Sequence, residues 1–389
     1  MLTILVATTS FPRWEGDYRG TFIWEGCRAL AGLGARIRVV APHAAGAKTH
    51  EVVGNVEIFR PRYLLPERWE VLLDTPGGLP VLWNAGKIGR LAVFPFFLAH
   101  ALAIARLARG CDLIHAHWTL SAFASRLGAP IHRRPLVCTV QGSDVYRAMR
   151  MPLAGALGRS ALRSARKVIA LSRSLADAVV AQGVDPHKVA VIPNGVDAKL
   201  FAPSGVPREP VVLFAGSLIE RKGVRILIEA MALVRHRYPA FNLVLIGDGP
   251  QRAELESLAA SSGLAASVRF TGSLAPEEVA RWMRRSELFV LPSLEEGQGV
   301  AMLEALASGT PCVATSVGGI PDVLSPEWGA LVPPGDPQAL ASAALDLLEH
   351  ADHRRGMEKQ AAAAVRDRYD WPVIARRILG VYAEVTSPQ

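Results

Sequence analysis

The sequence predicts an α/β protein with two doubly wound, Rossmann-like domains that face a central cleft. Short β-branched runs alternate with longer stretches of helical apolar periodicity along almost all 389 residues. A proline-rich break at Pro203, Pro207 and Pro210 interrupts this alternation, which then restarts. The length exceeds what one domain usually takes, and half of the residues are hydrophobic, so two cores can be buried.

The first half contains candidate strands that each end in a polar or glycine-bearing turn. A helix is expected at Gly20–Gly32. A second helix is expected at Ala161–Gln182, and it overlaps the strand expected at Lys167–Leu171. The start at Met1 lacks a basic region and a cleavage site, so it is interpreted as a first strand and not as a signal peptide. The strands are expected at Thr3–Thr8, Arg36–Ala41, Leu113–Ala116, Leu136–Val140, Lys167–Leu171 and Val189–Ile192.

The second half repeats the pattern, and the domains are expected at 1–195 and 196–370. Residues 371–389 are expected to form a helix that crosses back to the first domain, although it could instead cap the second. The strands are expected at Val211–Ala215, Asn242–Ile246, Val268–Thr271, Leu288–Leu291, Pro311–Thr315 and Gly329–Val332. The helices are expected at Val224–Arg237, Gln251–Ser262, Pro276–Arg285 and Pro337–Ala351.

The charge and the cysteines narrow the function classes. The formal charge of +8 and the pI near 9.6 favour anionic partners. No tract of lysine and arginine is interleaved with aromatic residues, so nucleic acid is not expected as a partner. Cys27, Cys111, Cys138 and Cys312 stand alone, which argues against a disulfide framework or a zinc site and favours a cytoplasmic protein.

A loop with two glutamates is the most informative segment. It follows the strand at 288–291 and contains Glu296, while Glu304 lies on the short apolar helix that comes next. Carboxylates at the carboxyl edge of a parallel sheet lie where such sheets bind ligands. A lone loop glutamate is usually only solvated, but a pair that brackets a glycine-rich turn is a candidate binding site.

A second turn suits a diphosphate. The strand at 211–215 leads through Gly216 to the adjacent cations Arg221 and Lys222, and then to Gly223 and a helix. Fixed cations beside the free N–H groups of a helix N-terminus attract phosphate. The alternative is a solvated charge pair on a surface loop.

The first half offers weaker signals. The turn before Gly20 has no Gly-x-Gly-x-x-Gly fingerprint, which disfavours an NAD-dependent oxidoreductase. His115 and His117 alternate along a strand, and three interpretations stay open: a metal ligand, a packed core histidine, or a polar cleft residue that contacts substrate. Further polar turns at 141–144, 194–197 and 247–250 are expected to line the same cleft.

The apolar segment Leu91–Ala105 is flanked by Lys87, Arg90, Arg106 and Arg109. It is too short, and too interrupted by Pro95 and His100, to predict a membrane-spanning helix. Two interpretations remain: a buried domain helix, or a patch that lies on an anionic membrane surface with its basic flanks among the headgroups.

Together these motifs resemble the family 4 glycosyltransferases, which have the GT-B architecture, and the resemblance covers nearly the whole chain. It rests on Asp112–Trp118, Ser172–Phe201, Gly216–Gly223, Ile246–Pro250 and above all Pro292–Pro311, which is similar to the family's E-x7-E motif with Glu296 and Glu304 at its ends. The resemblance implies a retaining enzyme that moves a sugar from a nucleotide-diphosphate sugar to a hydroxyl acceptor. It also implies no bound metal or other cofactor.

The same resemblance implies roles for single residues. Arg221 and Lys222 would hold the diphosphate and stabilise the departing nucleotide, which is electrostatic catalysis. Glu296 and His117 would face the donor sugar, and Glu304 would bind the ribose. The other donor-binding positions would be Gly20, Gly216, Gly249, Gly297, Gly299, Val300 and Ala301.

Three positions depart from the family pattern: Ser217, where many relatives have arginine, Gln298, where many have phenylalanine, and Gln141, where histidine is frequent. The acceptor is expected to be a glycan or lipid-linked intermediate of a cell-surface polysaccharide, with the enzyme peripheral on the inner face of the membrane. The alternative function is a nucleotide-sugar epimerase, or another non-transferase enzyme on the same frame. A catalytically silent binding subunit is disfavoured by the intact charged residues.

Overall fold

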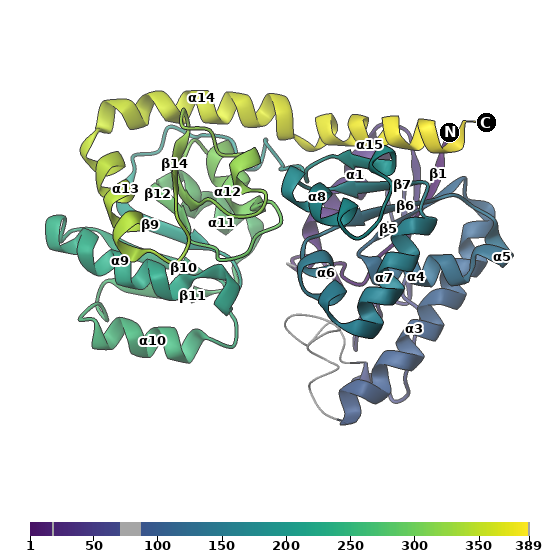
Figure 1. The fold of residues 1–389 in the computed structure, drawn as a ribbon. Helices are drawn as coiled ribbons and strands as arrows, with labels where there is room; N and C mark the ends of the chain where they lie inside the picture. Colours follow the sequence, from purple (N-terminus) through teal and green to yellow (C-terminus); the bar gives the residue numbers. More distant parts are fainter. Residues whose placement is uncertain (18, 71–86, 388–389) are drawn as a thin grey trace. The chain divides into compact units, whose positions relative to one another are not determined.

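The computed structural model describes residues 1–17, 19–70 and 87–387, and the chain divides into two compact units (Figure 1). The first unit comprises Met1–Pro193 with Ile374–Gln389, and the second comprises Asn194–Val373. Each unit is a mainly parallel sheet with helices on both faces (Figure 1). The predicted fold class of two Rossmann-like α/β sheets is therefore confirmed.

The first sheet has the strand order β3-β4-β2-β1-β5-β6-β7-β8. The pairs are parallel except that of β3 with β4. The strands are β1 Thr3–Ala7, β2 Arg36–Val40, β3 His50–Val53, β4 Val56–Phe59, β5 Leu113–His117, β6 Leu136–Val140, β7 Lys167–Ala170 and β8 Val189–Val191. The strand order reverses between β1 and β5, and ligands of doubly wound sheets bind at the carboxyl ends beside such a reversal.

The helices of the first unit cover both faces of this sheet. They are α1 Thr21–Gly32, α3 Lys87–Leu107, α4 Thr119–Leu127, α5 Ala129–His132, α6 Ser143–Tyr146, α7 Pro152–Ser164, α8 Arg173–Val180 and most of α15 Trp371–Thr386.

The second sheet is parallel throughout, in the order β11-β10-β9-β12-β13-β14. Its order reverses between β9 and β12. The strands are β9 Glu209–Ala215, β10 Asn242–Ile246, β11 Val268–Gly272, β12 Ser286–Leu291, β13 Cys312–Thr315 and β14 Gly329–Val332. The helices are α9 Val224–Arg237, α10 Arg252–Ser261, α11 Pro276–Arg285, α12 Val300–Ala307, α13 Pro337–Glu349 and α14 Ala351–Tyr369.

The central strands of both sheets are buried on both faces. Leu5 and Ile114 in the first unit, and Leu213 and Phe289 in the second, are fully buried. Such strands appear in the sequence as continuous apolar runs, because helices cover both sides of the sheet. This explains why the short apolar runs located the parallel strands well.

Several elements differ from the prediction, among them the helix α14, which was not expected. The helix expected at Ala161–Gln182 is wrong, because α7 ends at Ser164, β7 follows, and α8 begins after Ser172. The Ser172 side chain accepts the N–H of Leu175, a hydrogen bond that defines a helix start. The hairpin of β3 and β4 was not predicted, although its two-residue Gly54-Asn55 loop between valines is a hairpin signal.

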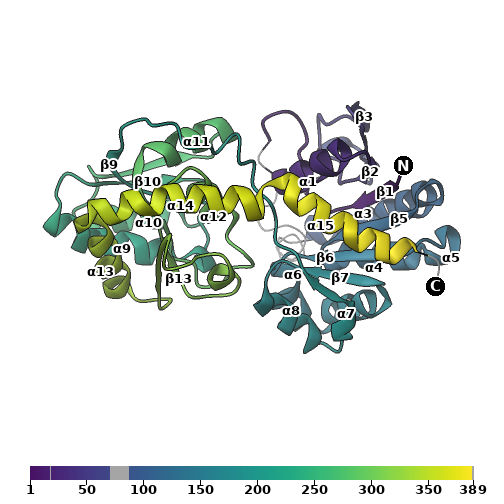
Figure 2. The same cartoon turned by 90° about the horizontal axis from the view of Figure 1, so that it is seen from above.

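The last helix, α15, packs within the first unit (Figure 2). The Tyr382 hydroxyl lies 2.6 Å from Nδ1 of His115 in β5. Arg377 donates to the carbonyl oxygen of Val191 at 2.8 Å. Residues more than 180 positions apart in sequence thus belong to one fold unit.

Candidate active site

An ion pair joins the carboxyl ends of two neighbouring strands in the second unit. Lys222 ends a 3₁₀ turn, η5 (Glu220–Lys222), after β9, and Glu296 lies on the loop after β12. Because β9 and β12 are paired, the loops that follow them are adjacent, and Nζ of Lys222 donates to Oε2 of Glu296. The Gly297 N–H also donates to Glu296 Oε1, at 3.1 Å.

These contacts set the charge of Glu296. Burial alone would raise the pKa of Glu296, but the charge and hydrogen bond of Lys222, the charge of Arg221 and the Gly297 N–H outweigh it. The pKa of Glu296 is therefore held below its ordinary value, and the group is a carboxylate at neutral pH. The site therefore contains a buried negative charge, on Glu296, that the ion pair with Lys222 holds in place.

The backbone of Arg221 binds the two loops together. Its carbonyl oxygen accepts the N–H of Leu294 at 2.8 Å. The next turn requires glycine at position 223, because φ is 65° and a Cβ there would lie 2.0 Å from the carbonyl oxygen of Pro292. The close approach of these backbones holds Arg221 and Lys222 beside Glu296.

The start of α12 carries several of the residues that the sequence predicts to contact the donor. Gly299 precedes the helix, Val300 and Ala301 form its first turn, and Glu304 lies one turn further on. The first N–H groups of a helix have no partner within the helix, so they are available to an anion. Burial raises the pKa of the half-buried Glu304 to about 8, so its carboxyl is largely protonated at neutral pH.

Two other predicted donor-binding positions lie in neighbouring loops of this sheet edge. Gly216 directly follows β9, and Gly249 lies between β10 and α10. A Cβ on Gly249 would lie 2.4 Å from the carbonyl oxygen of Leu218, so these two loops also approach closely. Ser217, one of the departures, lies next to Gly216 in the same loop.

Gln298 does not act as its position in the loop suggests. Its side chain is buried, Oε1 accepts the N–H of Asn194 at 2.6 Å, and Nε2 donates to the carbonyl oxygen of Asn194 at 3.0 Å. The side-chain amide of Gln298 therefore satisfies both the N–H and the carbonyl oxygen of Asn194, as the backbone of a neighbouring β-strand would. Gln298, one of the departures from the family pattern, therefore has a structural role.

In the first unit, His115 and His117 have different environments. His115 is buried, with Nδ1 bonded to the Tyr382 hydroxyl and Nε2 bonded to the Thr139 hydroxyl, each at 2.6 Å. His115 is the packed core histidine of the sequence alternatives, and it has no ring nitrogen free for a metal. His117 ends β5 and is partly exposed, and Nε2 of Gln141 lies 3.1 Å from its Nδ1.

Asp144 organises the turns around His117, a role that the sequence analysis did not assign. Its carboxylate accepts the N–H groups of Thr119 at 3.1 Å and of Gln141 at 2.9 Å. Burial raises the pKa of Asp144 to about 6 against the effect of these bonds. Trp118, which lies between His117 and Thr119, has a φ of 65°, a rare and strained conformation for a bulky residue.

Gly20 lies at the same edge of the first sheet. It precedes α1 with a φ of 62°, and a Cβ there would lie 2.6 Å from the carbonyl oxygen of Ser10. The turn after β1 is therefore closed by glycine, as the sequence suggested. Asp17, three residues before Gly20, accepts three hydrogen bonds from Arg13 and stabilises this turn.

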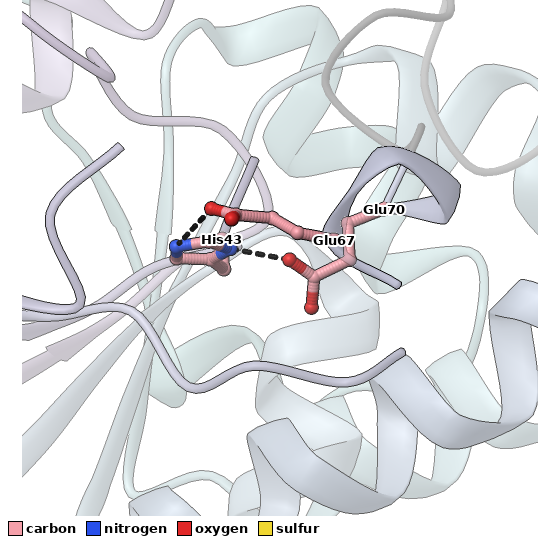
Figure 3. Close-up of side chains that lie close together, drawn as sticks. All are labelled: His43, Glu67 and Glu70. Carbon is pink, nitrogen blue, oxygen red and sulfur yellow. Dashed lines mark hydrogen bonds and ion pairs between the residues drawn. The ribbon is translucent and has the colours of Figure 1, made fainter. Parts of the chain in front are cut away.

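Within the described ranges, His43, Glu67 and Glu70 form a group that could hold a metal ion (Figure 3). Nδ1 of His43 is bonded to Glu70, and Nε2 lies 2.9 Å from the carbonyl oxygen of Ala47. Glu70 Oε1 also accepts the N–H of Tyr63 at 2.6 Å. A metal would have to displace one of these bonds, so the group is better described as a buried hydrogen-bonded cluster.

The chain is similar to known proteins over most of its length. The family model "Glycosyltransferase Family 4" matches residues 20–200, and "Glycosyl transferases group 1" matches residues 209–350. The chain is 32% identical over 307 residues to a D-inositol 3-phosphate glycosyltransferase of Corynebacterium efficiens, with 72% of each chain covered. It is 32% identical over 391 residues to a phosphatidyl-myo-inositol mannosyltransferase of Mycobacterium tuberculosis, covering 90% of this chain and 97% of the relative.

A solved structure also matches over almost the whole length. The sucrose-phosphate synthase of Thermosynechococcus elongatus superposes with a TM-score of 0.82 at 24% identity and covers 99% of both chains. At that identity the likeness concerns the fold.

Proposed function

The chain belongs to the group 1 and family 4 glycosyltransferases, enzymes that use a nucleotide-sugar donor, and from this premise we propose that it is a retaining hexosyltransferase acting on a lipid-linked acceptor. The donor binds to the second unit, and the acceptor binds to the first. The pairing of Lys222 with an ionised Glu296 beside Arg221 is the observation that carries the proposal.

The donor site acts through charge. Departure of the nucleotide places negative charge on its diphosphate, and Arg221 and Lys222 offset that charge as it develops. When Lys222 binds the diphosphate instead of Glu296, the Glu296 carboxylate can stabilise positive charge that develops on the sugar. The N–H groups at the start of α12 add further donors to the phosphate oxygens.

Glu304 binds the ribose hydroxyls in this scheme. A hydroxyl donates well to a carboxylate, so the ribose favours the ionised form and lowers a pKa that burial has raised to about 8. Nucleotide binding is thus coupled to release of a proton near neutral pH.

The apolar face of α3 supports a lipid-linked acceptor. Phe94, Leu98 and Leu102 are 72%, 49% and 58% exposed, and their spacing of four residues places them on one face of the helix. The opposite face, with Phe96 and Ile104, is buried in the unit. Such a helix lies on a membrane, with its exposed stripe in the headgroup region.

The segment Ala92–Gly110 is also long and apolar enough to cross a membrane, with a mean hydropathy of 1.4. However, 39% of it is buried within the protein, which favours a surface location. Arg106 and Arg109 at its end suit anionic headgroups. We place the enzyme at the cytoplasmic membrane face, and the lipid acceptor named for the mycobacterial relative supports this placement.

Sugar transfer from UDP-, GDP- and ADP-sugars to lipid-extract acceptors tests the function. We expect radiolabelled sugar in the lipid fraction with wild type, loss of it with Lys222→Ala, and no loss with Lys359→Ala on the exposed face of α14. Donor turnover without a glycosylated product would instead indicate an epimerase.

Vesicle flotation tests the membrane face. Serine at Phe94, Leu98 and Leu102 is expected to abolish binding to phosphatidylglycerol vesicles, whereas serine at the exposed Val52 and Val53 is not. Phe96 is left unchanged because it is buried, and replacing it could unfold the protein and so mimic a loss of vesicle binding. Equal flotation of both variants would refute the membrane assignment.

A further inference from the structure

The hydrogen bond between Gln141 and His117 defines where the proton of the His117 ring lies. Nε2 of the Gln141 amide lies 3.1 Å from Nδ1 of His117, and an amide nitrogen can only donate. Nδ1 must therefore be the unprotonated nitrogen, and Nε2 carries the proton. Since burial lowers the pKa of His117 to about 3, the ring is neutral at physiological pH, and its tautomer decides whether it donates or accepts.

The His117 ring also packs against the ring of His115. The centroids of His115 and His117 lie 4.5 Å apart with the planes tilted by 34°. His115 is itself fixed between the hydroxyls of Thr139 on β6 and Tyr382 on α15. Within the described part of the chain, Nε2 of His117 has no hydrogen-bond partner, so Nε2–H is available to a ligand.

Building on the function proposed above, we propose that Gln141 is a positioning residue that locks His117 as a hydrogen-bond donor. The Nε2–H group of His117 then binds an oxygen of the donor sugar or of the leaving diphosphate, and the ring does not act as a base. The departure of Gln141 from the family pattern is thereby explained, because a neutral amide donor fixes one tautomer without adding charge.

The ionisable groups around His117 keep the same charge near neutral pH, so they do not change the tautomer of the His117 ring. His115 lies on the same strand, and burial holds its pKa well below the ordinary value. Asp144 on α6 binds the backbone N–H of Gln141, and its pKa of about 6 leaves it mostly ionised above pH 7. Burial raises the pKa of Cys138 on β6 and of Tyr382 on α15 well above their ordinary values, so both stay neutral.

Nitrogen-15 NMR of histidine-labelled protein reads the tautomer directly, with His117→Gln used to assign the signal. We expect a protonated Nε2 and an unprotonated Nδ1 in wild type. In Gln141→Glu the new carboxylate accepts from Nδ1, so the proton should move to Nδ1. In Gln141→Met the two tautomers should both be populated. Gln360→Glu, on the exposed face of α14, is the matched control and should leave the ring unchanged.

The pH profile of sugar transfer separates positioning from a merely structural effect. At pH 8 we expect Gln141→Glu to lower kcat about 10-fold to 100-fold, the effect of one lost hydrogen bond to a charged or polar oxygen. As pH falls toward 6.5 the loss should shrink, because the imidazolium favoured by the carboxylate again carries Nε2–H. Thermal unfolding midpoints monitor the fold of each variant.

Two results would overturn the proposal: a wild-type ring protonated at Nδ1, or a Gln141→Glu enzyme with the wild-type tautomer and pH profile. Failure of the proposed function has a different signature. Wild type would then transfer no sugar from any donor tested, although its ring could still show the predicted tautomer.

Discussion

Replacing Gln298 by methionine should destabilise the second unit, although the two side chains have similar size and shape. The glutamine amide satisfies both the N–H and the carbonyl oxygen of Asn194, at 2.6 Å and 3.0 Å. Methionine can satisfy neither, and Gln298 is only 2% exposed, so water does not readily take its place.

The magnitude follows from these two groups. Each buried polar group left without a partner costs about 1–3 kcal/mol, which gives roughly 2–6 kcal/mol for the pair. A domain of this size loses about 2–4 °C of Tm for each kcal/mol, so we expect a decrease of roughly 4–24 °C. Asn194→Ala keeps the backbone groups and should cost much less.

Differential scanning calorimetry of the full chain measures the effect, because it resolves transitions of separate units. Gln360→Met, an exposed glutamine on α14, is the matched control and should stay within about 0.5 kcal/mol of wild type. A Gln298→Met protein whose transitions all lie within 1 °C of wild type would refute the reasoning. It would mean that the amide does not make the paired contact.

Three other predictions concern the proposed donor site. Calorimetric titration with a nucleoside diphosphate at pH 7 should show proton release in buffers of different ionisation enthalpy, and Glu304→Gln should abolish it, since a pKa of about 8 leaves Glu304 protonated before binding. The pKa of Glu296 is lowered, so its contribution to stability is present above pH 4.5 and is lost as pH falls further. In Lys222→Met, urea titrations should show that this acid-dependent loss is diminished and that stability at pH 7 is reduced by about 3–5 kcal/mol, because a buried charge loses its partner. Gly223→Ala should abolish transfer and lower Tm, because its Cβ would meet a backbone oxygen at 2.0 Å, whereas Gly380→Ala, which has open space, should do neither.

The sequence located the elements whose signal is local. The strands from β9 to β14 were predicted within about two residues at each end, because a strand covered on both faces is a continuous apolar run. The turns at Gly223 and Gly20 were also recognisable, since both need a backbone conformation that glycine favours. The loop of Glu296 could be placed at a sheet edge because β12 directly precedes it.

What sequence reasoning missed depends on partners far along the chain. In the sequence Gln298 stands out only as a departure from the family pattern, and nothing local reveals that its amide pairs with Asn194, 104 residues earlier. The different environments of His115 and His117 depend on Tyr382, 267 residues after His115. Likewise, the raised pKa of Glu304 reflects the burial of its surroundings, which the motif spacing cannot convey.

The first unit is built from two segments that lie far apart in the sequence, and this has a consequence for biosynthesis. Its sheet is complete once Pro193 has been made, but Tyr382, which fixes His115, is added 189 residues later. At about 5–20 residues per second, the nascent first unit waits roughly 10–40 s for its last helix. The second unit is continuous in sequence and ends at Val373, so it is synthesised before Tyr382 is added. Premature termination just after Val373 would therefore release a chain that has the whole second unit but lacks Tyr382, the hydroxyl partner of His115.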